Sequence, residues 1–240
     1  MEGANSGPQN TRIAVVTGGN KGIGFEVCRQ LASGGVTVVL TARDETRGTA
    51  AVEKLKGLGI SGVVFHQLDI TNASSIAGLA DFLKTRFGKL DILVNNAAIG
   101  GVEYLQELDT NEEKFIKNEE VRHELNNIDN LTEQRIDELL DKFLEDFEAG
   151  TSEAQGWPTV LAAYKMAKAA MNAYSRILAK RHPELRVNCV HPGYVRTDIT
   201  MGSGILTPEE GARNVVNVAL LPEGASTGLY FDKGEEAPFV

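Results

Sequence analysis

The sequence predicts an α/β protein built on a doubly wound parallel sheet. Short apolar, β-branched runs alternate with segments of helical periodicity, and a glycine-rich turn follows the first run. Of the 240 residues, 42% are hydrophobic and 24% are charged, which suits one large domain with a sizeable core. Strands that alternate with helices of this length form βαβ units, and these units build a parallel sheet.

The alternation is clearest in the first hundred residues. Buried strands are expected at 12–17, 36–41, 62–67 and 90–95, because each run is apolar and bounded by polar residues or glycines. Helices are expected between them at 24–33, 44–58 and 72–87. Asp44 is expected to cap the second of these helices.

The strand pattern fails after Asn96. Residues 100–157 contain no four-residue apolar, β-rich run. Residues 131–149 predict instead an amphipathic helix, preceded by loops and a further short helix. The α/β pattern then resumes, with helices expected at 159–181 and 208–221 and strands at 186–190 and 228–231. A strand is therefore missing from the middle of the predicted sheet.

The charge distribution bears on the partners of the chain. The net charge is −9, and residues 103–153 carry 17 Asp or Glu against 5 Lys or Arg. Neither nucleic acid nor an anionic membrane is expected as a partner of such an acidic protein. The slightly basic remainder is compatible with an anionic cofactor. An acidic helical face exposed to solvent, without any binding role, would explain the segment equally well.

The first ten residues, Met1–Asn10, are polar and lack the apolar core of a secretory signal. We expect them to form a disordered tail, followed by a single domain over 11–240 with an acidic helical insert at 103–157.

A cytoplasmic location is expected, and no apolar run is long enough to cross a membrane. Cys28 and Cys189 lie in apolar segments and are expected to be buried thiols.

The four histidines show no metal-ligand spacing, so no metal site is expected.

The glycine-rich turn predicts a ligand more directly than the histidines do. It reads TGGNKGIG at 17–24, directly after a strand and at the start of a helix. Gly18 would permit the tight turn, Gly22 would let backbone approach a pyrophosphate, and Gly24 would let the helix pack closely. The free N–H groups of the helix would attract the phosphates, so the turn predicts a dinucleotide site.

The end of the second strand bears on the choice between NAD and NADP. NAD sites favour a carboxylate there, which binds the ribose 2′-hydroxyl, whereas this strand is followed by Arg43. Arg43 and Lys21 can both pair with a 2′-phosphate, which favours NADP(H). Alternatively, both are solvated surface cations. Asp44 is a further candidate for a ribose hydrogen bond, although capping the following helix is its simpler role.

Tyr164 and Lys168 lie four residues apart in a predicted helix, so their side chains share one face. A phenol with its ordinary pKa near 10 is a poor proton donor at neutral pH. A neighbouring ammonium group stabilises the tyrosinate and makes the phenol a workable general acid or base. The spacing is also common by chance, so the pair alone does not establish an active site.

Five motifs follow one another in chain order: TGGNKGIG at 17–24, LDIT at 68–71, NNAA at 95–98, YKMAK at 164–168 and PGYVRTD at 192–198. Taken together, they resemble the short-chain dehydrogenase/reductase family, whose fold is a Rossmann-like doubly wound parallel sheet. Three finer features are the acidic insert, the sequence Gly156-Trp157-Pro158 and GILTPEE at 204–210. These features resemble the plant menthone/neomenthol and salutaridine reductase-like branch of the family.

The resemblance implies a reductase that transfers a hydride between NADP(H) and a hydrophobic ketone or secondary alcohol. Tyr164 would protonate the carbonyl oxygen, and Lys168 would tune Tyr164 and hold the nicotinamide ribose. Asp69 would contact the adenine, and the insert favours a monomer. The cofactor-binding residues that the resemblance implies are Gly18, Asn20, Lys21, Gly22, Ile23, Gly24, Arg43, Asp69, Ile70, Asn95, Ala97, Tyr164, Lys168, Pro192, Gly193, Val195 and Thr197.

The sequence departs from the family pattern between NNAA and Tyr164. Family members carry there a helix with a catalytic asparagine and a strand that ends in a catalytic serine, and this sequence has neither. Roughly 60 residues are missing near Ile116–Asn118, which agrees with the missing strand. Ser152 has a family-like spacing to Tyr164, but it follows a predicted helix and not a strand. We therefore interpret the chain as an internally deleted form with reduced stability and little reductase activity.

Two other functions remain open from the sequence. The chain could be a catalytically silent protein that binds NADP(H) through its first hundred residues and uses the acidic insert as a contact surface. It could also be an unstable product without any function.

Overall fold

The computed structural model describes residues 11–98 and 116–239, which fall into two compact units. The N-terminal unit comprises the described residues up to 98 together with 192–220, and the helical unit comprises 116–191 and 221–239. The predicted tail at Met1–Asn10 and the first part of the insert lie outside the described residues. The predicted boundaries of a single domain therefore stay a prediction.

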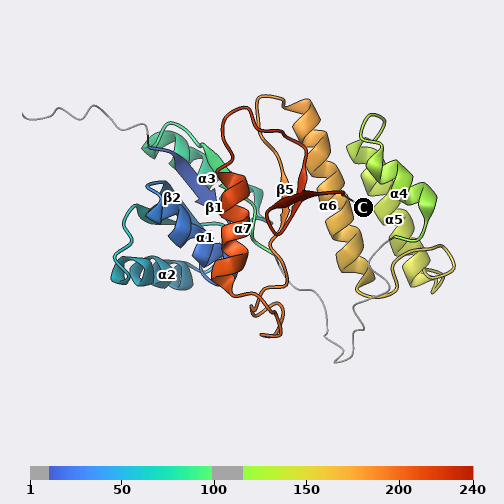
Figure 1. The fold of residues 1–240 in the computed structure, drawn as a ribbon, viewed down its shortest axis with the longest axis horizontal. Helices are drawn as coiled ribbons and strands as arrows, with labels where there is room; N and C mark the ends of the chain where they lie inside the picture. Colours follow the sequence, from blue (N-terminus) through green and yellow to red (C-terminus); the bar gives the residue numbers. More distant parts are fainter. Residues whose placement is uncertain (1–10, 99–115, 240) are drawn as a thin grey trace, which may run out of the picture. The chain divides into compact units, whose positions relative to one another are not determined.

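The N-terminal unit contains a parallel sheet of four strands in the order β3-β2-β1-β4 (Figure 1). The strands are β1 (Ile13–Val16), β2 (Thr37–Ala42), β3 (Val63–Gln67) and β4 (Ile92–Val94). Every side chain of β1 is buried, as expected for a central strand that helices cover on both faces. The predicted α/β class with a parallel central sheet is confirmed.

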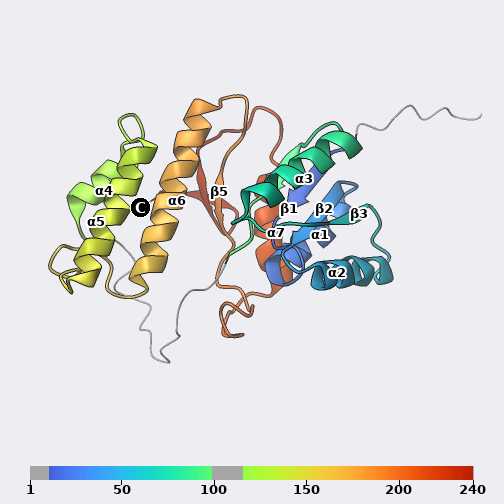
Figure 2. The ribbon, with the colours of Figure 1, turned by 180° about the vertical axis from the view of Figure 1, so that it is seen from behind.

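Helices cover both faces of this sheet. The helices α1 (Gly22–Ser33) and α7 (Pro208–Ala219) pack side by side, and with α2 (Glu45–Gly57) they form one core with Val16, Val38 and Leu40 (Figure 1). Helix α3 (Ala73–Arg86) lies on the opposite face, where Leu79 and Leu83 pack with Val15 and Val39 (Figure 2). Asp44 caps α2, as predicted, by accepting a hydrogen bond from the Arg47 N–H.

The sheet ends at β4, which pairs with β1 along one side. Among the described residues no strand pairs with its other side. Leu93, in the middle of β4, is 53% exposed, although its register partner Val15 in β1 is completely buried. A parallel strand with an exposed apolar centre is unusual, because parallel sheets are normally covered on both faces. The open edge is where the sequence predicts the missing strand.

The helical unit is held together by α4 (Glu119–Asn126), α5 (Glu133–Glu148) and α6 (Ala162–Arg181), which share one apolar core (Figure 2). Trp157 is the largest side chain in this core and is 1% exposed. Its ring packs edge-on against Phe143, and its indole N–H donates a 2.8 Å hydrogen bond to the Asp146 carboxylate. Within the acidic insert, α4 and α5 are therefore an ordered helical pair whose apolar residues are buried in this core.

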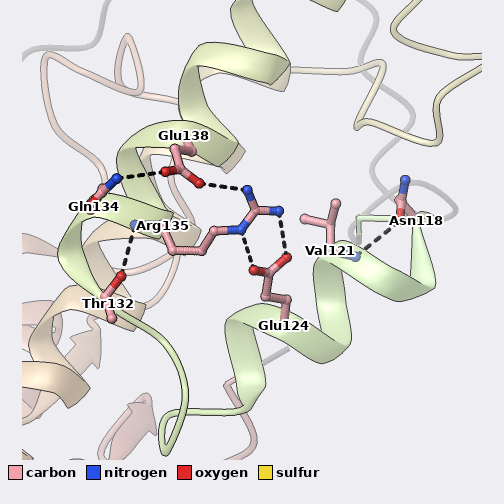
Figure 3. A network of polar contacts seen from close by, with 7 residues as sticks. All are labelled: Asn118, Val121, Glu124, Thr132, Gln134, Arg135 and Glu138. Carbon is pink, nitrogen blue, oxygen red and sulfur yellow. Dashed lines mark hydrogen bonds and ion pairs between the residues drawn. The ribbon is translucent and has the colours of Figure 1, made fainter.

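A branched ion pair joins α4 to α5 (Figure 3). The Arg135 guanidinium donates two hydrogen bonds to the two oxygens of Glu124 on α4 and one to Glu138 on its own helix. Thr132 caps the start of α5 by accepting a hydrogen bond from the Arg135 N–H. A bidentate arginine–carboxylate pair fixes geometry more strongly than a single contact, so Arg135 adds a directional contact to the apolar packing of the two helices.

A second, three-stranded sheet belongs to the helical unit. Strand β5 (Cys189–His191) runs parallel to β6 (Tyr230–Asp232), and β6 pairs antiparallel with β7 (Glu235–Ala237). The sequence does not predict β7, because Glu-Glu-Ala is not an apolar run. The hairpin turn gives the missing signal, since Lys233 and Gly234 both have positive φ, as the type I′ turn of a two-residue hairpin requires.

We expect Trp157→Ala to lower the free energy of unfolding by about 3–5 kcal/mol, because it leaves a cavity and removes one hydrogen-bond donor to Asp146. Urea unfolding followed by far-UV circular dichroism measures this change. Phe147→Ala is the control, since Phe147 lies on α5 and is 56% exposed; we expect a loss under about 1 kcal/mol. Equal losses in the two variants would contradict the assignment of Trp157 as the centre of this core.

Candidate functional site

The predicted cofactor-binding residues of the N-terminal unit follow the ends of its four strands. The glycine turn follows β1, Arg43 follows β2, Asp69 and Ile70 follow β3, and Asn95 and Ala97 follow β4. Because the strands are parallel, their carboxyl ends lie at the same edge of the sheet. Ligands of open α/β sheets bind at this edge. The residues of the first hundred positions are therefore gathered in one region.

The Thr17 hydroxyl holds the glycine turn against the segment after β4. Thr17 is buried, and its Oγ1 accepts 2.9 Å hydrogen bonds from the N–H groups of Asn96 and Ala97. The Asn96 side-chain amide donates in return to the Thr17 carbonyl at 2.8 Å. A Cβ atom at Gly18, which has φ +65°, would lie 3.0 Å from the Ala97 Cα. The turn can approach this segment so closely because position 18 is glycine.

Helix α1 begins with backbone N–H groups that no side chain caps. Its N-cap residue, Lys21, makes no capping hydrogen bond, and its first turn holds no acidic residue. Gly24 lets this turn pack tightly, because a Cβ atom there would lie 2.5 Å from the Gly18 carbonyl oxygen. Free N–H groups and the helix dipole favour an anion, so the residues present fit the pyrophosphate of a dinucleotide.

Arg43 and Asp69 lie near one another at the ends of β2 and β3. The N–H and the hydroxyl of Thr71 donate hydrogen bonds to the Asp69 carboxylate and lower its pKa, and the charge of Arg43 contributes in the same direction. Gln67 donates a 2.9 Å hydrogen bond to the Arg43 carbonyl, which fixes the backbone between the two strand ends. Asp69 is thus ionised at neutral pH, and the Arg43 side chain is exposed.

An open groove of about 500 Å³ lies beside the glycine turn. Lys21, Arg47 and Lys54 line it, together with Asn20, Gly22, Phe25, Ala50, Ala51 and Asp198. Sequence reasoning missed Arg47 and Lys54, because cations within a helix are usually solvated. Their spacing of seven residues was the available signal, since it places both on one face of α2. The groove extends the set of cations around the turn.

The PGYVRTD segment belongs to the N-terminal unit as well. The Lys21 ammonium pairs with the Asp198 carboxylate, and a Cβ atom at Gly22 would lie 3.5 Å from the Thr197 Cγ2. Val195 is buried, and the Asn214 amide donates a 3.0 Å hydrogen bond to the Pro192 carbonyl. The structure therefore brings Thr197 beside the glycine turn, although the two lie far apart in the sequence.

The predicted catalytic pair lies on α6, in the helical unit. Lys168 Nζ lies 5.6 Å from the centre of the Tyr164 ring, and Tyr164 is 44% exposed. The helix begins after Leu161, whose φ of 53° is in the left-handed region, and no side chain caps it. Residues held in such conformations cluster at functional sites, because the surrounding structure must stabilise them.

Ser152 is not positioned as a family-like serine. It lies in a turn after α5 and not at the end of a strand. Its carbonyl accepts a 3.0 Å hydrogen bond from the Trp157 N–H, while its buried Oγ has no hydrogen-bond partner among the described residues. Ser152 therefore contributes, through its backbone carbonyl, to the turn that positions Trp157.

Two family models match the chain. The model described as short chain dehydrogenase matches residues 12–142, and the model described as enoyl-(acyl carrier protein) reductase matches residues 149–226. The chain belongs to the short-chain dehydrogenase/reductase family. It is an oxidoreductase of this type, and the family uses nicotinamide cofactors. No helix in the described part of the chain is long and apolar enough to span a membrane.

Plant reductases are among the similar members of this family. Short-chain dehydrogenase/reductase 1 of Saponaria officinalis is 41% identical over 301 positions, which cover 100% of each chain. (+)-Neomenthol dehydrogenase of Arabidopsis thaliana is 41% identical, covering 96% of this chain and 99% of the relative. The structure of salutaridine reductase from Papaver somniferum matches with a TM-score of 0.82 at 39% identity, covering 92% of this chain and 99% of that one.

The alignment with the Saponaria relative also gives the number of positions that this chain lacks. The alignment has 301 positions and this chain has 240 residues, so at least 61 positions of the short-chain dehydrogenase/reductase relative have no counterpart here. These gaps are internal, because the alignment covers the whole of this chain. The number agrees with the roughly 60 residues that the sequence pattern predicts to be absent.

Thr17→Val should lower the free energy of unfolding by about 1–3 kcal/mol, because two partly buried N–H groups lose their acceptor. Nucleotide binding should weaken with it, since the same hydroxyl holds the glycine turn in place. Denaturant unfolding and isothermal titration with NADPH measure the two effects. The control is Thr46→Val at an exposed position of α2, and a similar loss in both variants would contradict the role of the Thr17 hydroxyl.

Proposed function

We propose that the chain binds NADP(H) at the carboxyl edge of its parallel sheet and acts on hydrophobic ketones or secondary alcohols. The observation that carries the proposal is the uncapped glycine turn at that edge, with Lys21, Arg43 and Arg47 around it. In this arrangement the free N–H groups of α1 would hold the pyrophosphate. The cations would hold the 2′-phosphate, which distinguishes NADP from NAD.

The role of Asp44 supports NADP over NAD. Its carboxylate accepts a 2.8 Å hydrogen bond from the Arg47 N–H and so caps α2. One oxygen of this carboxylate is therefore engaged at the start of the helix, which supports a capping role for Asp44 over a contact with a ribose 2′-hydroxyl. Arg43 is the side chain that the end of β2 offers to solvent, and a guanidinium binds phosphate through a planar pair of donors.

The substrate class follows from the relatives. The names of neomenthol dehydrogenase and salutaridine reductase refer to hydrophobic molecules of terpenoid and alkaloid type. When bound, the nicotinamide cofactor supplies a hydride to the carbonyl carbon of such a substrate. The Tyr164 hydroxyl would give a proton to the carbonyl oxygen, and the Lys168 ammonium beside its ring would stabilise the resulting tyrosinate.

The activity of this form should be low. In the family, the segment that is missing here carries the serine that positions the carbonyl oxygen, and Ser152 lies in a turn instead. Positioned hydrogen bonds of this kind contribute several kcal/mol to catalysis. Tyr164 alone would then act on a substrate whose oxygen is poorly oriented.

The second candidate is a catalytically silent NADP(H)-binding or interaction protein. One observation favours it: the glycine turn and Tyr164 belong to two compact units with separate sheets. In such a protein the N-terminal unit would retain the nucleotide, and the helical unit with its acidic helices would serve as a contact surface.

NADPH should raise the unfolding temperature of the unaltered protein by a few degrees, since a ligand at a hundred times its Kd adds about 2.7 kcal/mol of stability.

Arg43→Ala should weaken NADPH binding about 10- to 100-fold and leave NADH binding unchanged, because a charged hydrogen bond is worth about 1.5–3 kcal/mol. Thermal unfolding with each nucleotide measures this. Arg86→Ala on α3 is the control, and an equal response of NADH and NADPH to Arg43→Ala would contradict the assignment.

Tyr164→Phe should abolish any turnover of a cyclic ketone with NADPH and leave the NADPH-induced thermal shift intact, because it removes a proton and no phosphate ligand. Tyr174→Phe, at an exposed position of the same helix, is the control. Turnover that survives Tyr164→Phe would contradict the catalytic assignment. Saturable NADPH binding without any turnover by the unaltered protein would favour the silent candidate.

A further inference from the structure

We propose that two copies of this chain associate through β4, which pairs antiparallel with β4 of the second copy to join the two parallel sheets. The proposal rests on the open edge of the N-terminal unit and not on the enzymatic function. Strand edges with unpaired backbone groups readily pair with another chain. Proteins usually protect such edges with charged residues, prolines or bulges, and Ile92, Leu93 and Val94 offer none of these.

The side chains of this edge favour burial. Leu93 is 53% exposed and Leu90, just before the strand, is 41% exposed. Leu93 lies in register with Val15, a residue of the α3-side core, so its side chain points to that face of the sheet. Ile92 and Val94 point to the other face, where they pack with the α1-side core. A neighbouring strand would cover Leu93 without disturbing either core.

The sequence of the edge is complementary to itself. In an antiparallel pair centred on Leu93, the two Leu93 side chains lie opposite one another, and Ile92 lies opposite Val94. Asp91 of one copy then lies opposite Asn95 of the other, so a carboxylate meets an amide and not a second carboxylate. Like charges directly opposite one another are destabilising, and this register has none.

The charge of the N-terminal unit also permits contact between two copies. Residues 1–99 and 192–220 carry 12 Lys or Arg and 11 Asp or Glu, whereas the whole chain has a net charge of −9. The negative charge therefore belongs to the helical unit. A surface with a net charge near zero has little electrostatic repulsion against its own copy.

This inference departs from the monomer that the family resemblance implies. That expectation applies to a chain with a complete sheet, in which β4 is an internal strand. Here at least 61 positions of a relative have no counterpart, and β4 is the last strand of its sheet. The experiment must distinguish pairing of β4 with itself from association through other surfaces.

Sedimentation velocity over the micromolar range tests the association. The unaltered protein should form dimers, and Leu93→Lys should weaken the dimer at least tenfold, because a charged side chain on the paired edge opposes burial. The control is Leu58→Lys, a leucine at the end of α2 that is 57% exposed. A monomeric unaltered protein would overturn the proposal, and so would a dimer that Leu93→Lys leaves intact or that Leu58→Lys weakens equally.

Cross-linking tests the register. The native cysteines, Cys28 and Cys189, are buried, so Leu93→Cys adds an exposed thiol. Opposite residues of an antiparallel pair have Cα atoms about 4.5–5.5 Å apart, which lies within the range of disulfides. Mild oxidation should therefore link Leu93→Cys into covalent dimers and leave Leu58→Cys unlinked. Failure of Leu93→Cys to cross-link, or linkage of both variants, would overturn pairing centred on Leu93.

Discussion

The structure depends on the pairing of β4 with β1. This contact places Asn96 and Ala97 where the Thr17 hydroxyl can bind both of their N–H groups, and these bonds hold the glycine turn at the carboxyl edge. It is also the last pairing of the parallel sheet. The same strand therefore supports the glycine turn through the residues that follow it, while its own Leu93 is 53% exposed.

The N-terminal unit could be predicted well from the sequence, because its signals are local. Apolar runs predict its four strands, Asp44 caps α2 as expected, and glycines at 18 and 24 allow the close approaches that the motif predicts. The break in the pattern after Asn96 also predicts the open edge. Each of these features depends on residues that are neighbours in the chain or that share one strand–turn–helix unit.

Other features could not be predicted, because they depend on contacts between distant residues. The basic groove formed by Lys21, Arg47 and Lys54 requires α2 to pack beside the glycine turn. The family resemblance implies that Gly22 and Thr197 both bind the cofactor, but nothing in the sequence near either residue gives their contact. The separate sheet of β5, β6 and β7 arises because no described strand joins β5 to β4, and β7 itself is a polar strand that its hairpin turn specifies. The ion pair of Arg135 with Glu124 similarly requires α4 and α5 to be placed together.

The nucleotide site proposed for the N-terminal unit has to form without at least 61 positions that a relative contains. Hydrogen exchange with and without saturating NADPH tests this most directly, because it reports on individual segments. We expect slower exchange at 17–24 and 95–98, where Thr17 and the start of α1 would form the site. Unchanged exchange in both segments at saturating NADPH would contradict the proposed site, since it would mean that the missing positions are required to form it.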